Sequence, residues 1–392
     1  MTGPLRIYLT RPGAVRPRQW AGVSRYTSCL VSAVRRQAPD VEFCAAHFSL
    51  RGRLPPDHVA LAEEFGIRLR PVRCPDLSGV AGYLELLDRW VLPRHIERSG
   101  AQIAWGTNCS VPSSRRRRFR SVVTIHDLFL LERPELAAPE FYRHTLRQVR
   151  SLPDRCDLVL TDSQFSRGQI VRVLGMPAER VIVTPLAPAP TTVSPIAEPA
   201  AVLARLELAA PLVLSVGTVE ARKNYERGLE AFAELRRRGV GTELNWLIAG
   251  GRGWKADDVM ATRDRLGLAA CVRVRHDLTD VDLSALYRTA RCLFFPSPHE
   301  GFGLPAVEAM AAGLPVVAAR AGALPEVVAD AAELVDPDSP AEMAAGLERV
   351  LVDRERHADL AARGLRRAAE FSWDRAAALA VAAFRKLSDQ PC

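Results

Sequence analysis

The stretch at residues 292–318, CLFFPSPHEGFGLPAVEAMAAGLPVVA, decides the fold class of this chain. Its first four residues form a continuous apolar run, which is typical of a strand covered on both faces. Pro305 suits the first helical position, where a missing N–H costs nothing. A second apolar run, residues 316–318, follows the helical segment. The stretch therefore predicts a strand–helix–strand unit of a parallel sheet, with the loop 296–304 at the carboxyl end of a strand.

Short apolar runs of this kind recur along the whole chain and alternate with helix-like segments. They fall into two groups of six: residues 5–9, 41–47, 103–105, 122–125, 158–161 and 181–184, and then residues 212–216, 244–248, 272–274, 292–295, 316–318 and 332–334. Between the groups, the segment 185–200 is rich in Pro, Ala and Thr and is interpreted as a linker. The pattern predicts an α/β protein of two doubly wound, mostly parallel domains, residues 1–190 and 200–372, followed by an amphipathic helix within residues 373–392.

Composition limits the class of protein. A chain of 392 residues with 48% apolar content suits a globular protein of two domains. No apolar run approaches the roughly 20 residues of a membrane span, and the first residues lack the apolar core of a secretory signal. The eight cysteines are scattered, without CxxC pairs or metal-ligand spacing. We therefore expect neither a disulfide framework nor a structural metal, and a cytoplasmic location.

Charge is distributed unevenly. The basic residues are almost all Arg, which together with the Ala-rich composition suggests a GC-rich bacterial genome. Residues 1–195 hold 28 Arg against 17 Asp and Glu, a net of +11, whereas residues 196–392 hold 25 Lys and Arg against 28 Asp and Glu, a net of −3. A basic half favours an anionic partner, namely a phosphate, an acidic membrane face or a nucleic acid; a solvated Arg-rich surface is the alternative. Because the run RRRRFR at residues 115–120 lacks interleaved aromatic residues, we interpret it as a basic surface loop facing lipid headgroups.

The apolar run at residues 212–216 leads into a candidate anion site. Gly217 ends the expected strand, and Arg222 and Lys223 come just before a helix that begins near Asn224. The free N–H groups and the dipole of a helix N-terminus attract anions, and two adjacent cations add to this attraction. An isolated Arg-Lys pair is usually a surface pair, but this pair follows a buried strand. We therefore expect it to bind phosphate.

Two carboxylates bracket the loop after the strand at residues 292–295. Glu300 lies in the loop and Glu308 in the first turns of the next helix, and the backbone amides of residues 302–304 are expected to face an anion. Carboxylates accept hydrogen bonds from sugar hydroxyls, so the two acids and the two cations together suit a ligand with phosphates and hydroxyls, such as a nucleotide sugar. The alternative is a helix-dipole role for Glu308 and an exposed loop position for Glu300.

The N-terminal half offers weaker candidates. His126 and Asp127 follow the expected strand at residues 122–125, at the edge where open α/β sheets bind ligands. His126 can donate to a substrate hydroxyl, with Asp127 orienting it, or else the two residues cap a turn. Gly22 precedes a helix-like run and would let a phosphate approach it. The DVD at residues 280–282 resembles a metal-binding motif but precedes an amphipathic helix, so we interpret its acids as helix-capping or dipole-favoured residues.

Five segments of the sequence match a known family in the same order and over nearly the whole length. The chain resembles the retaining nucleotide-sugar glycosyltransferases of family 4. GTVEARKN (217–224) resembles the phosphate loop of that family and HEGFGLPAVEAM (299–310) its E-x7-E signature. AGGRGW (249–254), SALYRTARCLFFPS (284–297) and EFSWDRAA (370–377) resemble further family segments. The resemblance implies the GT-B fold, in which two Rossmann-like domains face each other across a cleft and the last helix crosses back to the N-terminal domain.

The resemblance also implies a role for each candidate residue. Arg222 and Lys223 would bind the donor diphosphate, Glu308 the ribose hydroxyls and Glu300 the hydroxyls of the donor sugar. His126 would lie beside that sugar. The other implied positions are Gly217 and Thr218 in the phosphate loop, Phe302, Gly303 and Leu304 as amide donors, Val274, Arg275 and His276 around the nucleobase, Gly22 at the closing N-terminal domain, and Arg25 and Asp127 on the acceptor side. Two positions depart from the usual pattern: Thr218 stands where many members have Arg, and Ala21-Gly22 where many have Gly-Gly.

The implied activity is a metal-independent, retaining hexosyl transfer without a cofactor. A GDP-mannose-like or UDP-hexose donor would pass its sugar to a hydroxyl of a sugar, lipid-linked or small-molecule acceptor, in polysaccharide, glycolipid or antibiotic biosynthesis. We expect peripheral contact with the inner membrane face and no nucleic-acid partner. A sugar-nucleotide epimerase, a phosphorylase and a non-catalytic nucleotide-sugar-binding protein remain alternatives. A nicotinamide-dependent dehydrogenase is disfavoured, because no G-x-G-x-x-G follows residues 5–9.

Overall fold

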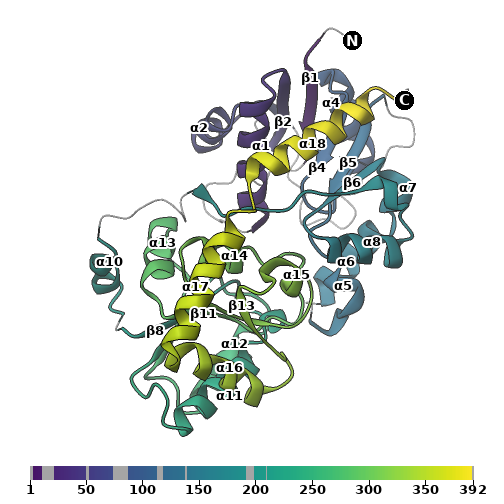
Figure 1. Ribbon diagram of the computed structural model, residues 1–392. Helices are drawn as coiled ribbons and strands as arrows, with labels where there is room; N and C mark the ends of the chain where they lie inside the picture. Colours follow the sequence, from purple (N-terminus) through teal and green to yellow (C-terminus); the bar gives the residue numbers. More distant parts are fainter. Residues whose placement is uncertain are drawn as a thin grey trace. The chain divides into compact units, whose positions relative to one another are not determined.

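The computed structural model describes residues 3–10, 22–49, 53–73, 87–112, 118–136, 139–190, 198–208 and 210–390. The chain divides into two compact units (Figure 1). The first comprises Met1–Leu128, Arg143–Leu186 and Trp373–Cys392, and the second comprises Phe129–Tyr142 and Ala187–Ser372. Neither unit is therefore continuous in the sequence. Residues 129–142 belong to the second unit, although the residues on both sides of them belong to the first. Residues 373–392 follow the second unit in the sequence but belong to the first.

The first unit is built on a parallel sheet of seven strands in the order β3-β2-β1-β4-β5-β6-β7. The strands are β1 (Leu5–Leu9), β2 (Val41–Ser49), β3 (Ile67–Arg73), β4 (Ile103–Gly106), β5 (Arg120–Thr124), β6 (Leu158–Thr161) and β7 (Val181–Val183). Its helices are α1 (Gly22–Gln37), α2 (Pro56–Glu64), α4 (Leu92–Ser99), α7 (Leu152–Arg155), α8 (Gln164–Leu174) and α18 (Trp373–Ser388), with a π-helical turn at Leu87–Val91. Helix α6 (Pro139–Arg150) lies across the boundary between the units.

Helix α18 packs against α1 within the first unit. Phe384 of α18 contacts Trp105 of β4, with ring centroids 5.4 Å apart. Two ion pairs join α18 to the end of α1 and the turn after it, from Arg36 to Asp374 at 2.6 Å and from Arg385 to Asp40 at 2.9 Å. The amphipathic helix expected at the end of the chain is thus present, and its apolar face covers the sheet of the first unit.

Strand β3 was not predicted from the sequence. The segment IRLRPVR carries three arginines and a proline, and its side chains are mostly exposed. It pairs only with β2, at the edge of the sheet, where one face and one side of the strand meet solvent. A search for continuous apolar runs finds strands covered on both faces and therefore passes over an edge strand of this kind.

Two further expectations fall partly outside the described residues. Of the segment 185–200, residues 191–197 are not described, and a helix, α10 (Pro199–Arg205), begins within its last residues. Of the basic run at residues 115–120, only the last three are described: Arg118 is exposed and lies in a bend, Phe119 is buried, and Arg120 begins β5. No helix in the described residues is long and apolar enough to cross a bilayer.

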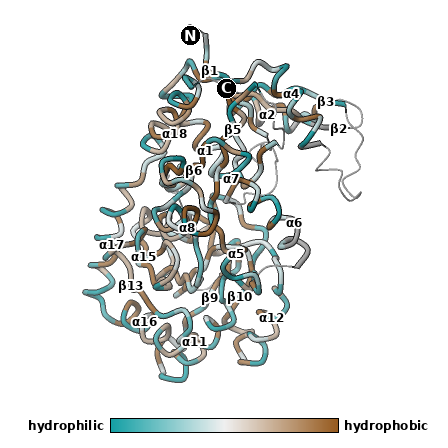
Figure 2. The backbone as a smooth tube through the Cα atoms, turned by 90° about the vertical axis from the view of Figure 1, so that its right-hand side faces the viewer, coloured by the Kyte–Doolittle hydropathy of each residue, from teal (hydrophilic) through white to brown (hydrophobic). Residues whose placement is uncertain are grey.

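The second unit is built on a parallel sheet of six strands in the order β10-β9-β8-β11-β12-β13. The strands are β8 (Leu212–Val216), β9 (Asn245–Ala249), β10 (Val272–Arg275), β11 (Cys292–Phe295), β12 (Val316–Ala319) and β13 (Ala332–Val335). The helices are α5 (Phe129–Glu132), α10, α11 (Tyr225–Arg237), α12 (Ala256–Arg265), α13 (Asp280–Thr289), α14 (Leu304–Ala311), α15 (Leu324–Val328), α16 (Pro340–Val352) and α17 (Arg354–Ala368). Along α16 and α17 the tube in Figure 2 changes between teal and brown, as expected for helices with one buried face.

The order of the second sheet places the candidate site. Strands β8 and β11 are neighbours although two other strands lie between them in the sequence. This is the point where the strand order reverses, and open α/β sheets bind ligands there, beyond the carboxyl ends of the strands. The loop after β8 carries Arg222 and Lys223, and the loop after β11 carries Glu300. The sheet therefore brings together two motifs that are almost 80 residues apart in the sequence.

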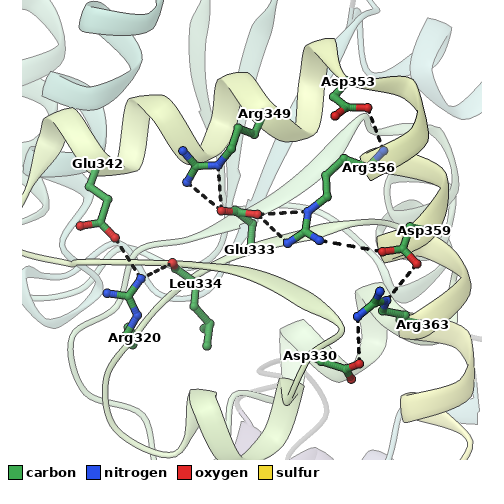
Figure 3. Close-up of polar contacts among 10 residues, drawn as sticks. All are labelled: Arg320, Asp330, Glu333, Leu334, Glu342, Arg349, Asp353, Arg356, Asp359 and Arg363. Carbon is green, nitrogen blue, oxygen red and sulfur yellow. Dashed lines mark hydrogen bonds and ion pairs between the residues drawn. The ribbon is translucent and has the colours of Figure 1, made fainter.

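An ion-pair network ties the last strand to two helices of the second unit (Figure 3). Glu333 of β13 is buried and accepts hydrogen bonds from Arg349 of α16 at 2.7 Å and from Arg356 of α17 at 2.9 Å. Arg363, one helical turn beyond Asp359, extends the network to Asp330 at 3.0 Å. Because one carboxylate receives two guanidinium groups, its removal leaves two arginines without their main partner.

We predict that Glu333→Gln lowers the free energy of unfolding by about 1–3 kcal/mol, because a buried carboxylate with charge-assisted bonds is lost. Urea unfolding measures the change. The control is Glu342→Gln, since Glu342 forms a single exposed pair with Arg320 at 3.0 Å, which should contribute at most about 0.5 kcal/mol. Equal effects of the two variants would show that the network adds nothing to an ordinary surface pair.

Candidate functional site

The two motifs at β8 and β11 meet in one buried ion-pair cluster. Lys223 Nζ donates to Glu300 Oε1 at 2.5 Å, and Arg222 Nη1 lies 3.5 Å from Glu300 Oε2. Lys223 and Glu300 are both 7% exposed. The predicted meeting of the cations with the first carboxylate is thus present, and the carboxylate of Glu300 binds both cations at once.

Further groups surround the two cations. Glu220 Oε1 accepts from Arg222 at 2.9 Å, and the Arg222 guanidinium also lies 4.9 Å from the ring centroid of Phe129. Lys223 Nζ lies 5.3 Å from the ring centroid of Phe295. The sequence predicted two cations available to an anion, but two carboxylates, Glu220 and Glu300, already neutralise them. An incoming anion must therefore exchange places with a carboxylate rather than fill an uncompensated positive site.

The protonation states follow from this arrangement. Burial would raise the pKa of Glu300, but the charges of Lys223 and Arg222 outweigh it and lower the pKa to about 2. Burial and the neighbouring Arg222 lower the pKa of Lys223, while Glu300 opposes that change. Glu300 is therefore ionised throughout the physiological range, and Lys223 depends on this carboxylate to keep its charge.

Backbone contacts hold the two loops together. Asn224 precedes α11 with φ 59° and ψ 30°, and its side-chain amide donates to the carbonyls of Pro296 at 3.1 Å and Pro337 at 2.7 Å. Ser297 Oγ donates to the carbonyl of Arg222 at 3.1 Å. The cations are thus fixed through their backbone as well as through their charges.

Two glycines allow the loop after β11 to take its shape. Gly303 precedes α14 with φ 94°, a conformation that favours glycine. Gly322 has φ 61°, and a Cβ at this position would lie 2.7 Å from the backbone nitrogen of Glu300. The backbone N–H groups of residues 302–304 have no acceptor among the described residues and remain available at the start of α14. Helix α14 begins at Leu304, so Pro305 occupies its second position, one later than expected.

Glu308 lies in the second turn of α14 and is 1% exposed. Tyr287 of α13 donates its hydroxyl to Glu308 Oε2 at 3.0 Å. A helix-dipole role at the surface does not explain a buried carboxylate with a phenol partner. The role of Tyr287 was not predicted from the sequence, although this residue lies in the family-like segment 284–297.

The remaining candidates of the second unit lie at other strand ends. Gly217 follows β8, and Thr218 is exposed. Val274 is half-buried at the end of β10, where Arg275 pairs with Asp277 at 2.8 Å. His276 Nδ1 contacts the carbonyl of Gly250 at 2.5 Å, which joins the loops after β9 and β10. Charge pairing thus engages Arg275 locally, and among the described residues no contact links Val274, Arg275 or His276 to Glu300.

The acidic triplet at residues 280–282 forms a helix start. Thr279 is the N-cap of α13: its hydroxyl accepts from the amide of Asp282, and the carboxylate of Asp282 accepts in return from the amide of Thr279 at 2.9 Å. This confirms the interpretation of the motif as helix capping. Within the described ranges, no group of three or more His, Cys, Asp or Glu residues is arranged to hold a metal ion.

In the first unit, His126 lies two residues beyond the end of β5. Its Nδ1 lies 2.7 Å from Asp162 Oδ2, and its Nε2 lies 3.1 Å from the carbonyl of Thr107. Burial lowers the pKa of His126, but Asp162 outweighs this effect, so the pKa is raised. The expectation that Asp127 orients His126 was wrong, because Asp162, which directly follows the neighbouring strand β6, makes this contact. Of the other candidates, Gly22 is the first residue of α1 and is exposed, and Arg25 is buried in the same helix.

The two halves of the sequence match two family profiles. Residues 20–187 match the profile described as Glycosyltransferase Family 4, and residues 205–367 match the profile described as Glycosyl transferases group 1. The chain is also 34% identical over 287 residues to the O-antigen chain mannosyltransferase B of Escherichia coli, and the match covers 72% of this chain and 74% of that protein.

Solved structures show the same fold. Sucrose-phosphate synthase from Thermosynechococcus elongatus matches with a TM-score of 0.76 at 20% identity, over 97% of this chain and 98% of that one. Alr3699/HepE of Anabaena, in complex with UDP and glucose, matches with a TM-score of 0.73 at 18% identity, over 99% of this chain and all of that one. The chain has two units built on parallel sheets, matches both family profiles and is 34% identical to the mannosyltransferase of Escherichia coli. It therefore belongs to the family 4 glycosyltransferases of the GT-B fold.

Proposed function

We propose that the chain transfers a hexose from a nucleoside-diphosphate sugar to a hydroxyl of a growing glycan, with retention at the anomeric carbon and without a metal ion. The single observation that carries the proposal is the cluster of Arg222, Lys223 and Glu300 at the reversal point of the second sheet. The mannosyltransferase relative and the UDP-bound neighbour support a GDP-mannose-like or UDP-hexose donor and a polysaccharide or glycolipid acceptor.

The first step is an exchange of anions. A diphosphate carries more negative charge than one carboxylate and accepts hydrogen bonds from several donors. It would therefore take Arg222 and Lys223 from Glu300, with the amides of residues 302–304 as further donors. The released carboxylate of Glu300 then accepts hydrogen bonds from the hydroxyls of the donor sugar, and Glu308 accepts from the ribose.

The chemical step needs no nucleophile from the protein. The bond between the anomeric carbon and the leaving phosphate oxygen breaks, and its electron pair stays on the diphosphate, where Lys223 and Arg222 stabilise the new charge. The acceptor oxygen forms a bond to the same face of the anomeric carbon. Its proton passes to an oxygen of the leaving phosphate. In this scheme Glu300 positions the sugar and does not attack it.

The other candidate residues complete the proposal. Val274, Arg275 and His276 would surround the nucleobase, Gly217 and Thr218 the phosphates, and His126 a hydroxyl of the donor sugar. Gly22 would let the donor phosphate approach the start of α1, and Arg25 and Asp127 would contact the acceptor. We further propose that the protein works in the cytoplasm, with peripheral contact to the membrane that carries a lipid-linked acceptor.

We predict that Lys223→Ala lowers the rate of sugar transfer at least 100-fold, because the charge that stabilises the leaving diphosphate is lost. The substrate is found first by mass spectrometry, which detects slow hydrolysis of each nucleotide sugar without an acceptor. Lys386→Ala is the matched control, since Lys386 is exposed in the last turn of α18. Full turnover by Lys223→Ala would refute the proposed role of the cluster.

We predict that Glu300→Gln strengthens the binding of the nucleoside diphosphate alone several-fold, while it lowers the transfer rate. The diphosphate no longer competes with a carboxylate for Arg222 and Lys223, but the donor sugar loses its acceptor group. Isothermal titration calorimetry measures the first effect and product formation the second. Weaker diphosphate binding by the variant would contradict the exchange of anions.

We also predict a difference in acid stability between the wild type and Glu300→Gln. The pKa of Glu300 is about 2 in the folded chain, below its ordinary value of 4.5, so this group stabilises the fold above pH 4.5 and loses that contribution as the pH falls toward 2. Between pH 5 and pH 3 the free energy of unfolding of the wild type should fall by about 2 kcal/mol more than that of the variant. Urea unfolding at several pH values measures both. Parallel curves would show that Glu300 is not ion-paired in solution.

A further inference from the structure

The residues that follow three neighbouring strands of the first sheet meet at His126. Strands β4, β5 and β6 are adjacent, and Thr107, His126 and Asp162 follow them within two residues. Both ring nitrogens of His126 face acceptors: a carboxylate oxygen of Asp162 at 2.7 Å and the carbonyl of Thr107 at 3.1 Å. A neutral imidazole has a single N–H, whereas an imidazolium donates from both nitrogens and can make both bonds. With Asp162 as a carboxylate, the geometry thus selects the protonated ring.

The surroundings of the ring fit a cation. The ring of Tyr26 lies 4.8 Å from the His126 ring, centroid to centroid, at 85°, and its hydroxyl is engaged with Thr124 Oγ1 at 3.0 Å. Asp162 immediately precedes Ser163, the N-cap of α8, where a negative charge is favoured. Ser166 of the same helix donates to the carbonyl of His126 at 3.1 Å, so the backbone of His126 is fixed to α8 as well.

Two buried oxygen atoms beside His126 make no hydrogen bond to the described residues. Asp162 Oδ1 and Thr107 Oγ1 have no hydrogen-bond partner among the described residues, and each residue is 2% exposed. The half-buried Asp127 adds a second negative charge near the ring. The nearby thiol of Cys109 stays neutral, because burial, Asp127 and Asp162 raise its pKa to about 12.

We propose that Asp162 is a positioning residue, which holds His126 as an imidazolium of fixed orientation. The Nε2–H of His126 then donates to a hydroxyl of the donor sugar in place of the Thr107 carbonyl. This inference rests on the proposed function. It makes His126 a permanent hydrogen-bond donor and not a base. Transfer then depends on a proton that Asp162 keeps on His126.

The experiment follows the protonation of His126 directly. Histidine-labelled protein is titrated by NMR, and His126→Gln identifies the signal. In the wild type we expect a midpoint above the ordinary value of 6.5. Asp162→Asn, which keeps the shape but removes the charge, should lower this midpoint by at least about one pH unit, a tenfold loss of proton affinity. The control Asp157→Asn removes a half-buried carboxylate that pairs with Arg120 at 3.2 Å, and should leave the midpoint unchanged.

The rate of transfer gives the second readout. Activity that needs the imidazolium is present below the pKa of His126 and is lost above it, so in Asp162→Asn the alkaline limb of the pH profile of kcat/KM should move down with the NMR midpoint. A wild-type midpoint at or below 6.5, or an unchanged midpoint in Asp162→Asn, overturns the pairing. A lower midpoint without a shift of the pH profile overturns the positioning role.

Two further outcomes stay distinguishable. If Asp162→Asn does not fold, the wild-type titration still decides whether the ring is held protonated, and Asp162→Glu, which retains the charge, should keep the high midpoint. If the wild type transfers no sugar from any nucleotide donor, the proposed function fails, and the positioning role fails with it. In that case the titration shows whether the ion pair exists without that role.

Discussion

The ion pair between Lys223 and Glu300 is the contact on which the candidate site depends. Each residue alone would be a buried charge, which a protein interior does not tolerate without a partner. Each comes from the loop after one of two adjacent strands, β8 and β11, so the pair can form only if these strands are neighbours in the sheet. The site is therefore a consequence of strand order, and the pair in turn fixes the two loops at the carboxyl edge of the sheet.

The helices that begin at this pair have unusual starts. Asn224 precedes α11, but its side chain binds two carbonyls of other loops instead of capping the helix, and Gly303 before α14 has no side chain to do so. By contrast, side chains of Thr279 and Ser339 cap α13 and α16. Helices α12 and α15 also lack a capping side chain, so this feature alone marks no site. At α11 and α14 it coincides with the buried ion pair, and uncapped N–H groups beside two cations suit an anion.

Much of the fold could be predicted because buried parallel strands have continuous apolar sequences. The same rule explains the failure at β3, whose arginines and proline fit an edge position. The candidate residues at strand ends could also be found, since His126, Arg222 and Glu300 each follow an apolar run. The contacts between these residues could not be predicted. Asp162 follows an apolar run just as His126 does, yet only the sheet order shows that the two meet, and the same holds for Tyr287 and Glu308.

The two units use the same device with different results. In each, a cation after one strand is paired with a carboxylate after the adjacent strand: Lys223 with Glu300, and His126 with Asp162. The side chain of Glu300 is 10% exposed and pairs with two cations, Lys223 and Arg222, so a multiply charged anion can replace it. The side chain of Asp162 is 2% exposed, and its cation makes its second bond to a backbone carbonyl. An incoming anion can separate Lys223 from Glu300, and this suits the binding of a leaving diphosphate. The pair of His126 and Asp162 stays intact, and this suits an imidazole ring whose charge and orientation must not change.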